Sequence, residues 1–208
     1  EEPAAREAAD AVEYRMDLAD AGFDGLAAYD GALPLIVTDR VEWEGGESAD
    51  TPERIDRLVR AVEQPTVAAV DVELAAVEDC QPVVEAAAGT DVSIIVSVHD
   101  FEKTPGRDEL AAKLDAACEH GDVGKLAVTA QSRADVLDLL AVTHEQTAAG
   151  NTVATMAMGE AGRHSRAVAP LYGSRIGYAP VDPEAATAPG QYHLEQLRSL
   201  VDALDDDA

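Results

Sequence analysis

Short apolar runs alternate with longer amphipathic segments along the whole chain. Seven runs have the length and the Val, Ile and Ala content of buried strands, and they span residues 11–17, 34–40, 66–74, 91–100, 122–130, 151–159 and 174–181. Strands of a parallel sheet read as nearly continuous apolar runs because both faces of such a sheet are covered. The pattern therefore predicts a sheet of parallel strands.

The segments between these runs have the boundary residues of helices. Thr51 precedes Pro52, which is typical of an N-cap followed by a proline at the first helical position. Ser132 and Asp135 are spaced as a capping box. We expect helices over 1–10, 51–64, 132–146 and 193–207.

Strands that alternate with helices indicate right-handed crossovers in one sheet. The count of strands and helices predicts an α/β fold, a (β/α)8 TIM barrel that forms a single domain over 1–208, with its first strand missing from the given chain. An open doubly wound sheet is the alternative. No GxGxxG follows any of the strands, which disfavours that alternative.

Polar residues of the predicted strands fall on one side of each strand. The set comprises Glu13, Arg15, Asp17, Thr38, Arg40, Asp71, Glu73, Ser93, Ser97, His99, Lys125 and Thr129. In a barrel this side faces the interior, and the carboxyl ends of the strands carry the active site. Because buried charges persist where pairing or chemistry requires them, we interpret the set as a functional site. A purely structural ion network is the alternative.

Charge and cysteine content narrow the classes of partner. The formal net charge is -26, and such a field repels nucleic acid and anionic membrane surfaces, so we expect neither as a partner. The acidic residues are spread over periodic segments, which favours a folded, halophile-like surface over a disordered tail. Cys80 and Cys118 lack the spacing of a metal site, and the chain begins without a secretory leader, so we expect a cytoplasmic protein.

Lys125 is the strongest candidate for chemistry. It is one of three lysines in the chain, and it lies inside a predicted strand. Enclosure destabilises an ammonium ion, so the free amine could attack a carbonyl and form a Schiff base. His99 ends the preceding strand, close enough to serve as a general base on the same small molecule. A structural pair between Lys125 and Glu73 or Glu13 is the alternative for this lysine.

At these residues the sequence resembles type I 3-dehydroquinate dehydratase, over nearly the whole chain. The matching stretches are EYRMD, LPLIVTDRVEWEGGE, VDVEL, SVHDFEKTP, DVGKLAV, MAMGEAGRHSR, YGSRIGYAPV and TAPGQ. The resemblance implies a Schiff base between Lys125 and the C3 ketone of 3-dehydroquinate. It further implies that His99 removes the C2 proton and then assists loss of the C1 hydroxyl, which yields 3-dehydroshikimate in the shikimate pathway of aromatic amino acid biosynthesis.

The resemblance also implies roles for the remaining site residues. Glu44 would support His99, and Arg166 would grip the substrate carboxylate. The residues that would hold the ring hydroxyls and close the site are Glu13, Arg15, Arg40 and Gln191. Thr187 stands where the family usually has serine before APGQ, and its hydroxyl is kept. The resemblance implies no metal and no organic cofactor, and family members are often homodimers.

Asp39 and Val98 depart from the family pattern. Asp39 replaces a bulky apolar residue between Thr38 and Arg40, and we interpret it as an outward-facing surface adaptation. We also expect the loop 184–193 to act as a lid over bound substrate. Two other functions remain open: a class I aldolase that uses the same lysine, and a binding module that lacks catalysis.

Overall fold

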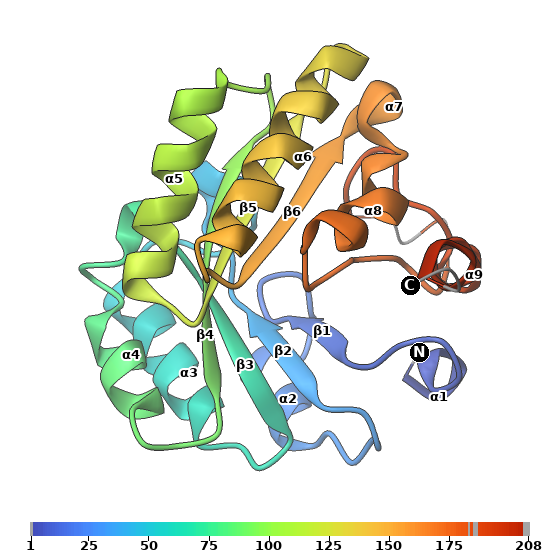
Figure 1. The fold of residues 1–208 in the computed structure, drawn as a ribbon. Coiled ribbons are helices and arrows are strands. Elements are labelled where there is room, and N and C mark those ends of the chain that lie inside the picture. Colours follow the sequence, from blue (N-terminus) through green and yellow to red (C-terminus); the bar gives the residue numbers. More distant parts are fainter. Residues whose placement is uncertain (1, 183, 185–186, 206–208) are drawn as a thin grey trace.

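The computed structural model of the chain describes residues 2–182, 184 and 187–205, and it contains a six-stranded sheet (Figure 1). The strands are β1 (Val12–Arg15), β2 (Leu35–Thr38), β3 (Val67–Glu73), β4 (Ser93–Asp100), β5 (Val123–Thr129) and β6 (Val153–Met158). All neighbouring pairs are parallel, and the order across the sheet follows the chain. The carboxyl ends of all six strands therefore lie at the same end of the sheet.

Helices connect the strands. They are α1 (Glu2–Ala5), α2 (Gly22–Ala27), α3 (Pro52–Val62), α4 (Gln81–Ala87), α5 (Arg107–His120), α6 (Arg133–Ala148), α7 (Gly159–Gly162), α8 (Ser165–Val168) and α9 (Leu194–Asp205), with 3-10 turns η1 (Glu42–Glu44), η2 (Leu74–Ala76) and η3 (Ala169–Tyr172). Figure 1 shows α3 to α6 along one side of the sheet. The last helices, α8 and α9, pack on each other beyond β6.

The predicted helix starts are confirmed. Pro52 is the first residue of α3 and follows Thr51, which has the extended backbone of an N-cap. Asp135 accepts the backbone N–H of Ser132 at 3.0 Å, as the capping box requires. The opening helix is shorter than expected, and residues 206 and 207 of the expected final helix lie outside the described residues.

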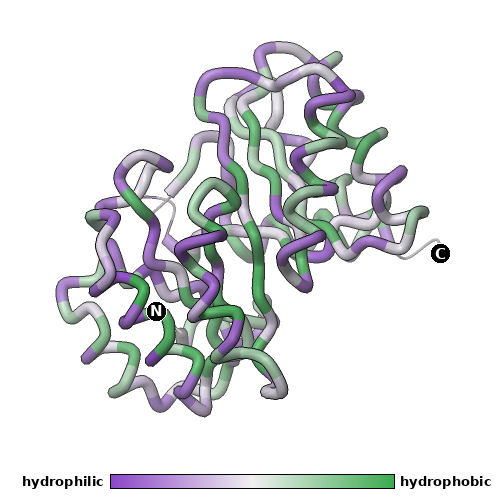
Figure 2. The backbone as a smooth tube through the Cα atoms, turned by 90° about the vertical axis from the view of Figure 1, so that its left-hand side faces the viewer, coloured by the Kyte–Doolittle hydropathy of each residue, from purple (hydrophilic) through white to green (hydrophobic). Residues whose placement is uncertain are grey.

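The hydrophobic core lies between the sheet and the helices that cover it. Val70, Val72 and Val96 pack with Leu58 and other residues of the first half of the chain. A second cluster joins the alternate apolar residues of β5 to α5 and α6. In Figure 2 the hydrophobic stretches follow the strands through the middle of the molecule. The apolar side of each strand thus faces the helices, as predicted, and the polar side is left for the interior.

The seventh predicted strand is wrong. Residues 174–181 make a single bridge to the sheet, between Ser174 and Val153. Gly177 and Pro180 disfavour a longer pairing, because glycine weakens a strand and proline cannot donate to its ladder. Among the described residues β1 and β6 are the two edges of the sheet, so the structure shows a half-barrel and does not confirm the closed barrel.

Candidate active site

A pocket lies over the inner face of the sheet, toward the carboxyl ends of its strands. Its lining includes all nine predicted site residues: Glu13, Arg15, Arg40, Glu44, His99, Lys125, Arg166, Thr187 and Gln191. These residues come from segments between β1 and the approach to α9. Alternation of side chains along parallel strands explains why Glu13, Arg15, His99 and Lys125 converge, because the polar side of every strand faces the same space. Glu44 lies in η1, Arg166 lies in α8, and Thr187 and Gln191 lie in the segment before α9.

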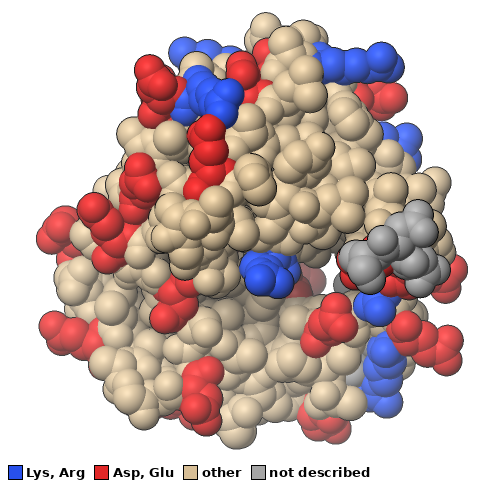
Figure 3. Space-filling view, viewed as in Figure 1, with Lys and Arg blue, Asp and Glu red and all other residues tan. Residues whose placement is uncertain are grey.

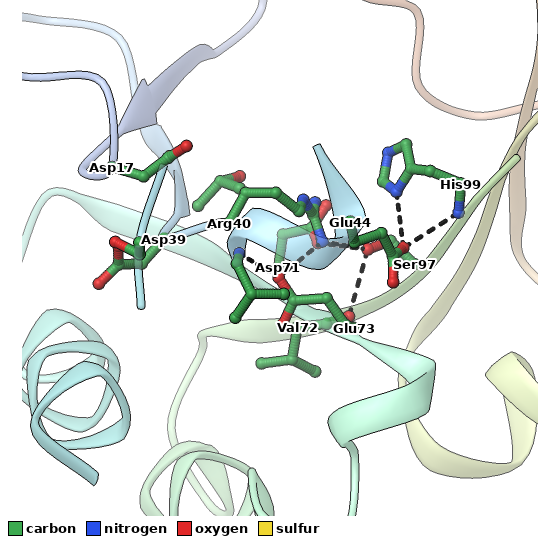
Figure 4. Close-up of polar contacts among 12 residues, drawn as sticks. Asp17, Asp39, Arg40, Glu44, Asp71, Val72, Glu73, Ser97 and His99 are labelled. Atoms are coloured by element: carbon green, nitrogen blue, oxygen red, sulfur yellow. Dashed lines mark hydrogen bonds and ion pairs between the residues drawn. The ribbon is translucent and has the colours of Figure 1, made fainter. Parts of the chain in front are cut away.

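The floor of the pocket is a buried ion network. Arg40 donates to Asp71 at 2.6 Å, to Glu73 at 3.1 Å and to the hydroxyl of Ser97 at 2.7 Å. Lys125 donates to the other oxygen of Asp71 at 2.8 Å. Figure 4 shows Arg40 reaching into the group formed by Asp71, Glu73 and Ser97. Every charge named here has a partner of opposite sign, which is how a protein can keep such groups out of water.

The state of Lys125 corrects one prediction. Burial alone would lower the pKa of its ammonium group, but the carboxylate of Asp71 reverses this effect, so the pKa of Lys125 is raised above its ordinary value. The resting lysine is therefore an ammonium ion, not the free amine expected from its enclosure. Its partner is Asp71, not Glu73 or Glu13. The nitrogen also lies 4.4 Å from the ring centroid of Tyr178, over the face of the ring.

His99 and Glu44 form the second pair of the site. One oxygen of Glu44 lies 2.8 Å from Nδ1 of His99 and accepts the backbone N–H of the same residue at 3.0 Å. Burial, followed by the charges of Arg40 and Lys125, lowers the pKa of His99 well below its ordinary value. A neutral imidazole that donates from Nδ1 to Glu44 leaves Nε2 free to accept a proton.

Glu44 itself has an unusual protonation equilibrium. Burial raises its pKa to about 7, and the nearby carboxylates of Glu73 and Asp71 act in the same direction, whereas Arg40 acts against them. Glu44 therefore changes charge near neutral pH.

The register of two strands sets the spacing between lysine and histidine. In the β4–β5 pair, Ser97 lies opposite Lys125, and His99 lies opposite Ala127. His99 therefore lies two residues nearer the carboxyl ends of the strands than Lys125, and both side chains are on the same side of the sheet. A small molecule above Lys125 would meet His99 at its flank.

The mouth of the pocket carries charges with fewer partners. Glu13 accepts the hydroxyl of Thr38 at 2.7 Å, and Arg15 pairs with Asp17 at 2.6 Å. Arg166 is 4 % exposed, yet its Nε and one terminal nitrogen are buried without a hydrogen-bond partner among the described residues. Burial lowers the pKa of Arg166 to about 10. Such an arginine is suited to bind an anion, because a buried charge without a partner has an unfavourable free energy that an anion would offset.

Comparison with known proteins decides the family. The family model of type I 3-dehydroquinase matches residues 2–208. The chain belongs to the type I 3-dehydroquinase family. It is therefore classed with carbon–oxygen lyases of the hydro-lyase type, as the resemblance implied.

Relatives of this chain include proteins of salt-loving archaea. It is 58% identical to the 3-dehydroquinate dehydratase of Haloarcula marismortui, over 100% of this chain and 93% of that protein. It is 52% identical to the corresponding protein of Halobacterium salinarum, over 96% of this chain and 90% of that protein. These relatives fit the halophile-like interpretation of the acidic composition.

Solved structures of the family share the fold. The crystal structure of the type I 3-dehydroquinate dehydratase from Clostridium difficile with covalent modified comenic acid has a TM-score of 0.87 and 30% sequence identity, and the match covers 100% of this chain and 87% of that one. The 3-dehydroquinate dehydratase from Geobacillus kaustophilus has a TM-score of 0.85 and 29% identity, with 99% and 84% covered. Within the described part of this chain, no helix is long and apolar enough to cross a membrane.

Several pocket residues were not predicted from the sequence. Tyr178, Phe101, Met156 and Met158 also line the pocket. Asp71 was placed on the polar side of its strand but not assigned to Lys125. The apolar residues carried no signal in a single sequence. Tyr178 was hidden inside the seventh strand that does not form.

Asp39 is buried, which contradicts its interpretation as a surface adaptation. Its relative exposure is 1 %, and it points away from the pocket, toward α3, where Arg57 pairs with it at 2.8 Å (Figure 4). The outward orientation was predicted correctly. The error lay in equating the outward side with water, because α3 covers it.

The segment predicted to close the site is only partly described. Residues 185 and 186 of the expected lid lie outside the described residues. In the part that follows, Gln191 accepts the backbone N–H groups of Thr187 at 3.0 Å and of Ala188 at 3.3 Å. This turn holds Thr187 and Gln191 beside the pocket.

Proposed function

We propose that this chain converts 3-dehydroquinate to 3-dehydroshikimate through a Schiff base on Lys125. One observation carries the proposal: a buried lysine and a histidine backed by a carboxylate line the same pocket. Family membership supports the reaction, and the geometry supports the roles of the individual residues.

Imine formation begins with loss of a proton from Lys125. The ammonium ion cannot attack, and in our proposal it first passes one proton to a water molecule in the pocket. The amine then adds to the C3 carbonyl, and that proton returns to the carbinolamine hydroxyl, which leaves as water and gives an iminium ion. Asp71 stays ionised throughout, since Arg40 and Lys125 hold its pKa below the ordinary value despite its burial.

Elimination follows on the iminium ion. Nε2 of His99 takes the C2 proton, and the electron pair left behind forms an enamine. The enamine expels the C1 hydroxyl, which leaves as water with the proton returned by His99. Addition of water to the remaining iminium releases the product and returns Lys125 to its ammonium form. The net change is loss of one water molecule.

Substrate binding uses the mouth of the pocket. Arg166 is proposed to pair with the carboxylate, because its buried donors have no partner among the described residues. Glu13, Arg15, Gln191 and Thr187 are proposed to contact the ring hydroxyls. Arg40 already donates three hydrogen bonds to the floor, so we assign it mainly to ordering Asp71 and Glu73.

The experiment that tests the proposal is borohydride reduction in the presence of 3-dehydroquinate, in high salt, followed by peptide mass spectrometry. Since the chain has three lysines, Lys103 and Lys113 serve as internal controls. We expect the adduct on the peptide that holds Lys125, and none with Lys125→Met. Folded protein without an adduct would overturn the imine mechanism.

Turnover of 3-dehydroquinate without cleavage of a carbon–carbon bond would separate the proposed function from the two alternatives. A class I aldolase would also trap on Lys125 but would release carbon fragments, and a binding module would not turn over substrate. We also propose, as further expectations, a single (β/α)8 barrel domain over 1–208, action in the shikimate pathway of the cytoplasm without a cofactor, and a homodimer.

A further inference from the structure

Asp39 is a buried carboxylate outside the pocket, yet it contacts the segment that carries a catalytic group. Its side chain accepts hydrogen bonds from Nε of Arg57 at 2.9 Å and from the hydroxyl of Ser48. Arg54 donates to its backbone carbonyl at 3.0 Å. The ion pair with Arg57 fixes the carboxylate on α3, a helix that belongs to the core. Asp39 can therefore act as an anchor for Ser48.

Ser48 is in turn tied to both ends of a short loop. We use the name Glu44 loop for residues 41–48, which comprise η1 and the turn after it. The backbone N–H of Ser48 donates to the carbonyl of Arg40 at 3.0 Å, and its carbonyl accepts from Glu42 at 3.0 Å. The backbone of Ser48 thus joins the two ends of the Glu44 loop, and Asp39 holds the side chain of Ser48.

The Glu44 loop is tight, and backbone hydrogen bonds to the carbonyls of Val41 and Glu42 close its 3-10 turn. Gly45 has φ of +80°, and a Cβ on Gly46 would come within 2.0 Å of the carbonyl oxygen of Arg40. A three-residue 3-10 turn cannot fix a side chain by helical hydrogen bonding alone. Besides Ser48, the described contacts of the loop include the backbone N–H of Glu47, which donates to Asp17 at 3.3 Å.

Glu44 projects from this loop to His99, which is 55 residues away in the chain. The contact of 2.8 Å between its oxygen and Nδ1 fixes the ring orientation that leaves Nε2 toward the pocket. A displacement of about an ångström in a supporting group can change a rate by a large factor. The rigidity of the Glu44 loop is therefore part of the catalytic geometry.

We propose that Asp39 is a positioning residue for the dehydration reaction, acting through Ser48 on the Glu44 loop and thus on His99. The inference rests on the proposed function and deepens it, because it names a residue that touches no substrate. The inference predicts that loss of Asp39 slows the proton transfers made by His99. The rate of imine formation on Lys125 should stay the same, since Lys125 belongs to β5 and makes no contact with Asp39.

The test compares Asp39→Ala and Ser48→Ala with the parent protein, in one high-salt buffer. Two quantities are measured for each: kcat for dehydration per folded molecule, and the rate of borohydride-trapped adduct at Lys125. Glu145→Ala, which breaks the exposed pair with Arg107, is the matched control. Ser48→Ala removes a single hydroxyl, so it keeps the test valid if Asp39→Ala folds poorly.

We expect kcat to fall roughly 10-fold or more in both variants, the scale for loss of a supporting contact, with trapping within about twofold of the parent. The kcat of the double variant should be no lower than that of the more impaired single variant, because both substitutions remove the same contact between Asp39 and Ser48. Unchanged kcat in folded Ser48→Ala would overturn the inference, as would equal losses in kcat and trapping. Absence of any adduct in the parent protein would instead overturn the proposed function, and this inference with it.

Discussion

Two buried arginines of the same pocket show two different uses of charge. Arg40, on the floor, donates to Asp71, Glu73 and Ser97, whereas Arg166, at the mouth, has buried donors without a partner among the described residues. Coulombic attraction raises the pKa of Arg40 despite its burial, and burial lowers that of Arg166 to about 10. A charge with its partners in place supports the structure, and a charge without them is available to a ligand.

The difference follows from position along the strands. Arg40 lies beside β3, whose consecutive inward residues Asp71 and Glu73 supply carboxylates. Arg166 lies in α8, after β6, whose described residues carry no acidic side chain. One half of the pocket is therefore complete without substrate, and the other half is completed by it.

The largest effect is expected from a substitution in the ion network at the floor of the pocket, where each charge already has a partner. Glu73→Gln removes the carboxylate that accepts from both Arg40 and Arg54, so one donor of each buried guanidinium group loses its anionic partner. We expect a loss of about 3–5 kcal/mol in the free energy of unfolding. Denaturant titration checks this, with exposed Glu145→Gln as a control expected within about 0.5 kcal/mol of the parent. Similar losses in the two variants would mean that the floor network is not structural.

The incomplete half should respond in the opposite way. Arg166→Met removes a buried charge without a described partner, so stability should stay the same or increase. Affinity for 3-dehydroquinate should fall by about 30-fold or more, which corresponds to about 2 kcal/mol for a lost charge-assisted contact. Calorimetric binding and denaturant titration of one preparation give both numbers. A stability loss as large as that of Glu73→Gln would contradict the distinction between the two arginines.

The pH dependence of kcat tests the pair that bridges the two halves. Because burial raises the pKa of Glu44 to about 7, its carboxylate is lost as pH falls through that value. We assign activity to the ionised form, which accepts Nδ1–H of His99. Activity should therefore rise with pH and level off above about 7, changing about tenfold per pH unit on the acidic side. Glu44→Gln should lower kcat and abolish the rise of kcat with pH below about 7. If the rise persists in that variant, the titrating group is not Glu44.

The smallest effect is expected at Tyr178. Its hydroxyl is buried without a partner among the described residues, while its ring lies beside Lys125. Tyr178→Phe keeps the ring and removes the hydroxyl, so stability should rise by at most about 1 kcal/mol. Turnover should stay within about threefold of the parent. Tyr172→Phe, at an exposed tyrosine, is the matched control, and a much larger loss at Tyr178 would give its hydroxyl a direct role.

Much of this architecture was readable from alternation alone. The charged residues of β3 and the lysine of β5 lie on the inner side because strand side chains alternate, and parallel strands align their ends. Alternation placed Glu13, Arg15, Arg40, His99 and Lys125 on one side of their strands. The family resemblance, and not alternation, added Glu44, Arg166, Thr187 and Gln191, and all nine residues line the pocket.

Other features depend on tertiary context that a single sequence does not contain. The direction of the Lys125 pKa depends on which carboxylate reaches it, and three acidic residues were within plausible range. Asp39 could be assigned to the outer side but not to burial, since that requires the position of α3. Residues 174–181 have the apolar content of a strand, but pairing needs a partner along their length, and only Ser174 has one.

The acidic exterior described above has a consequence for the rate of substrate capture. Figure 3 shows basic atoms in the hollow at the centre of one face and acidic side chains around its margin. An anionic substrate approaches a molecule of net charge -26 and is repelled until it nears the arginines of the pocket. Salt shortens the range of that repulsion from about 10 Å at 0.1 M to about 3 Å at 1 M. We therefore expect concentrated salt to speed the encounter of this protein with the proposed anionic substrate, whereas salt slows association in most electrostatically steered pairs.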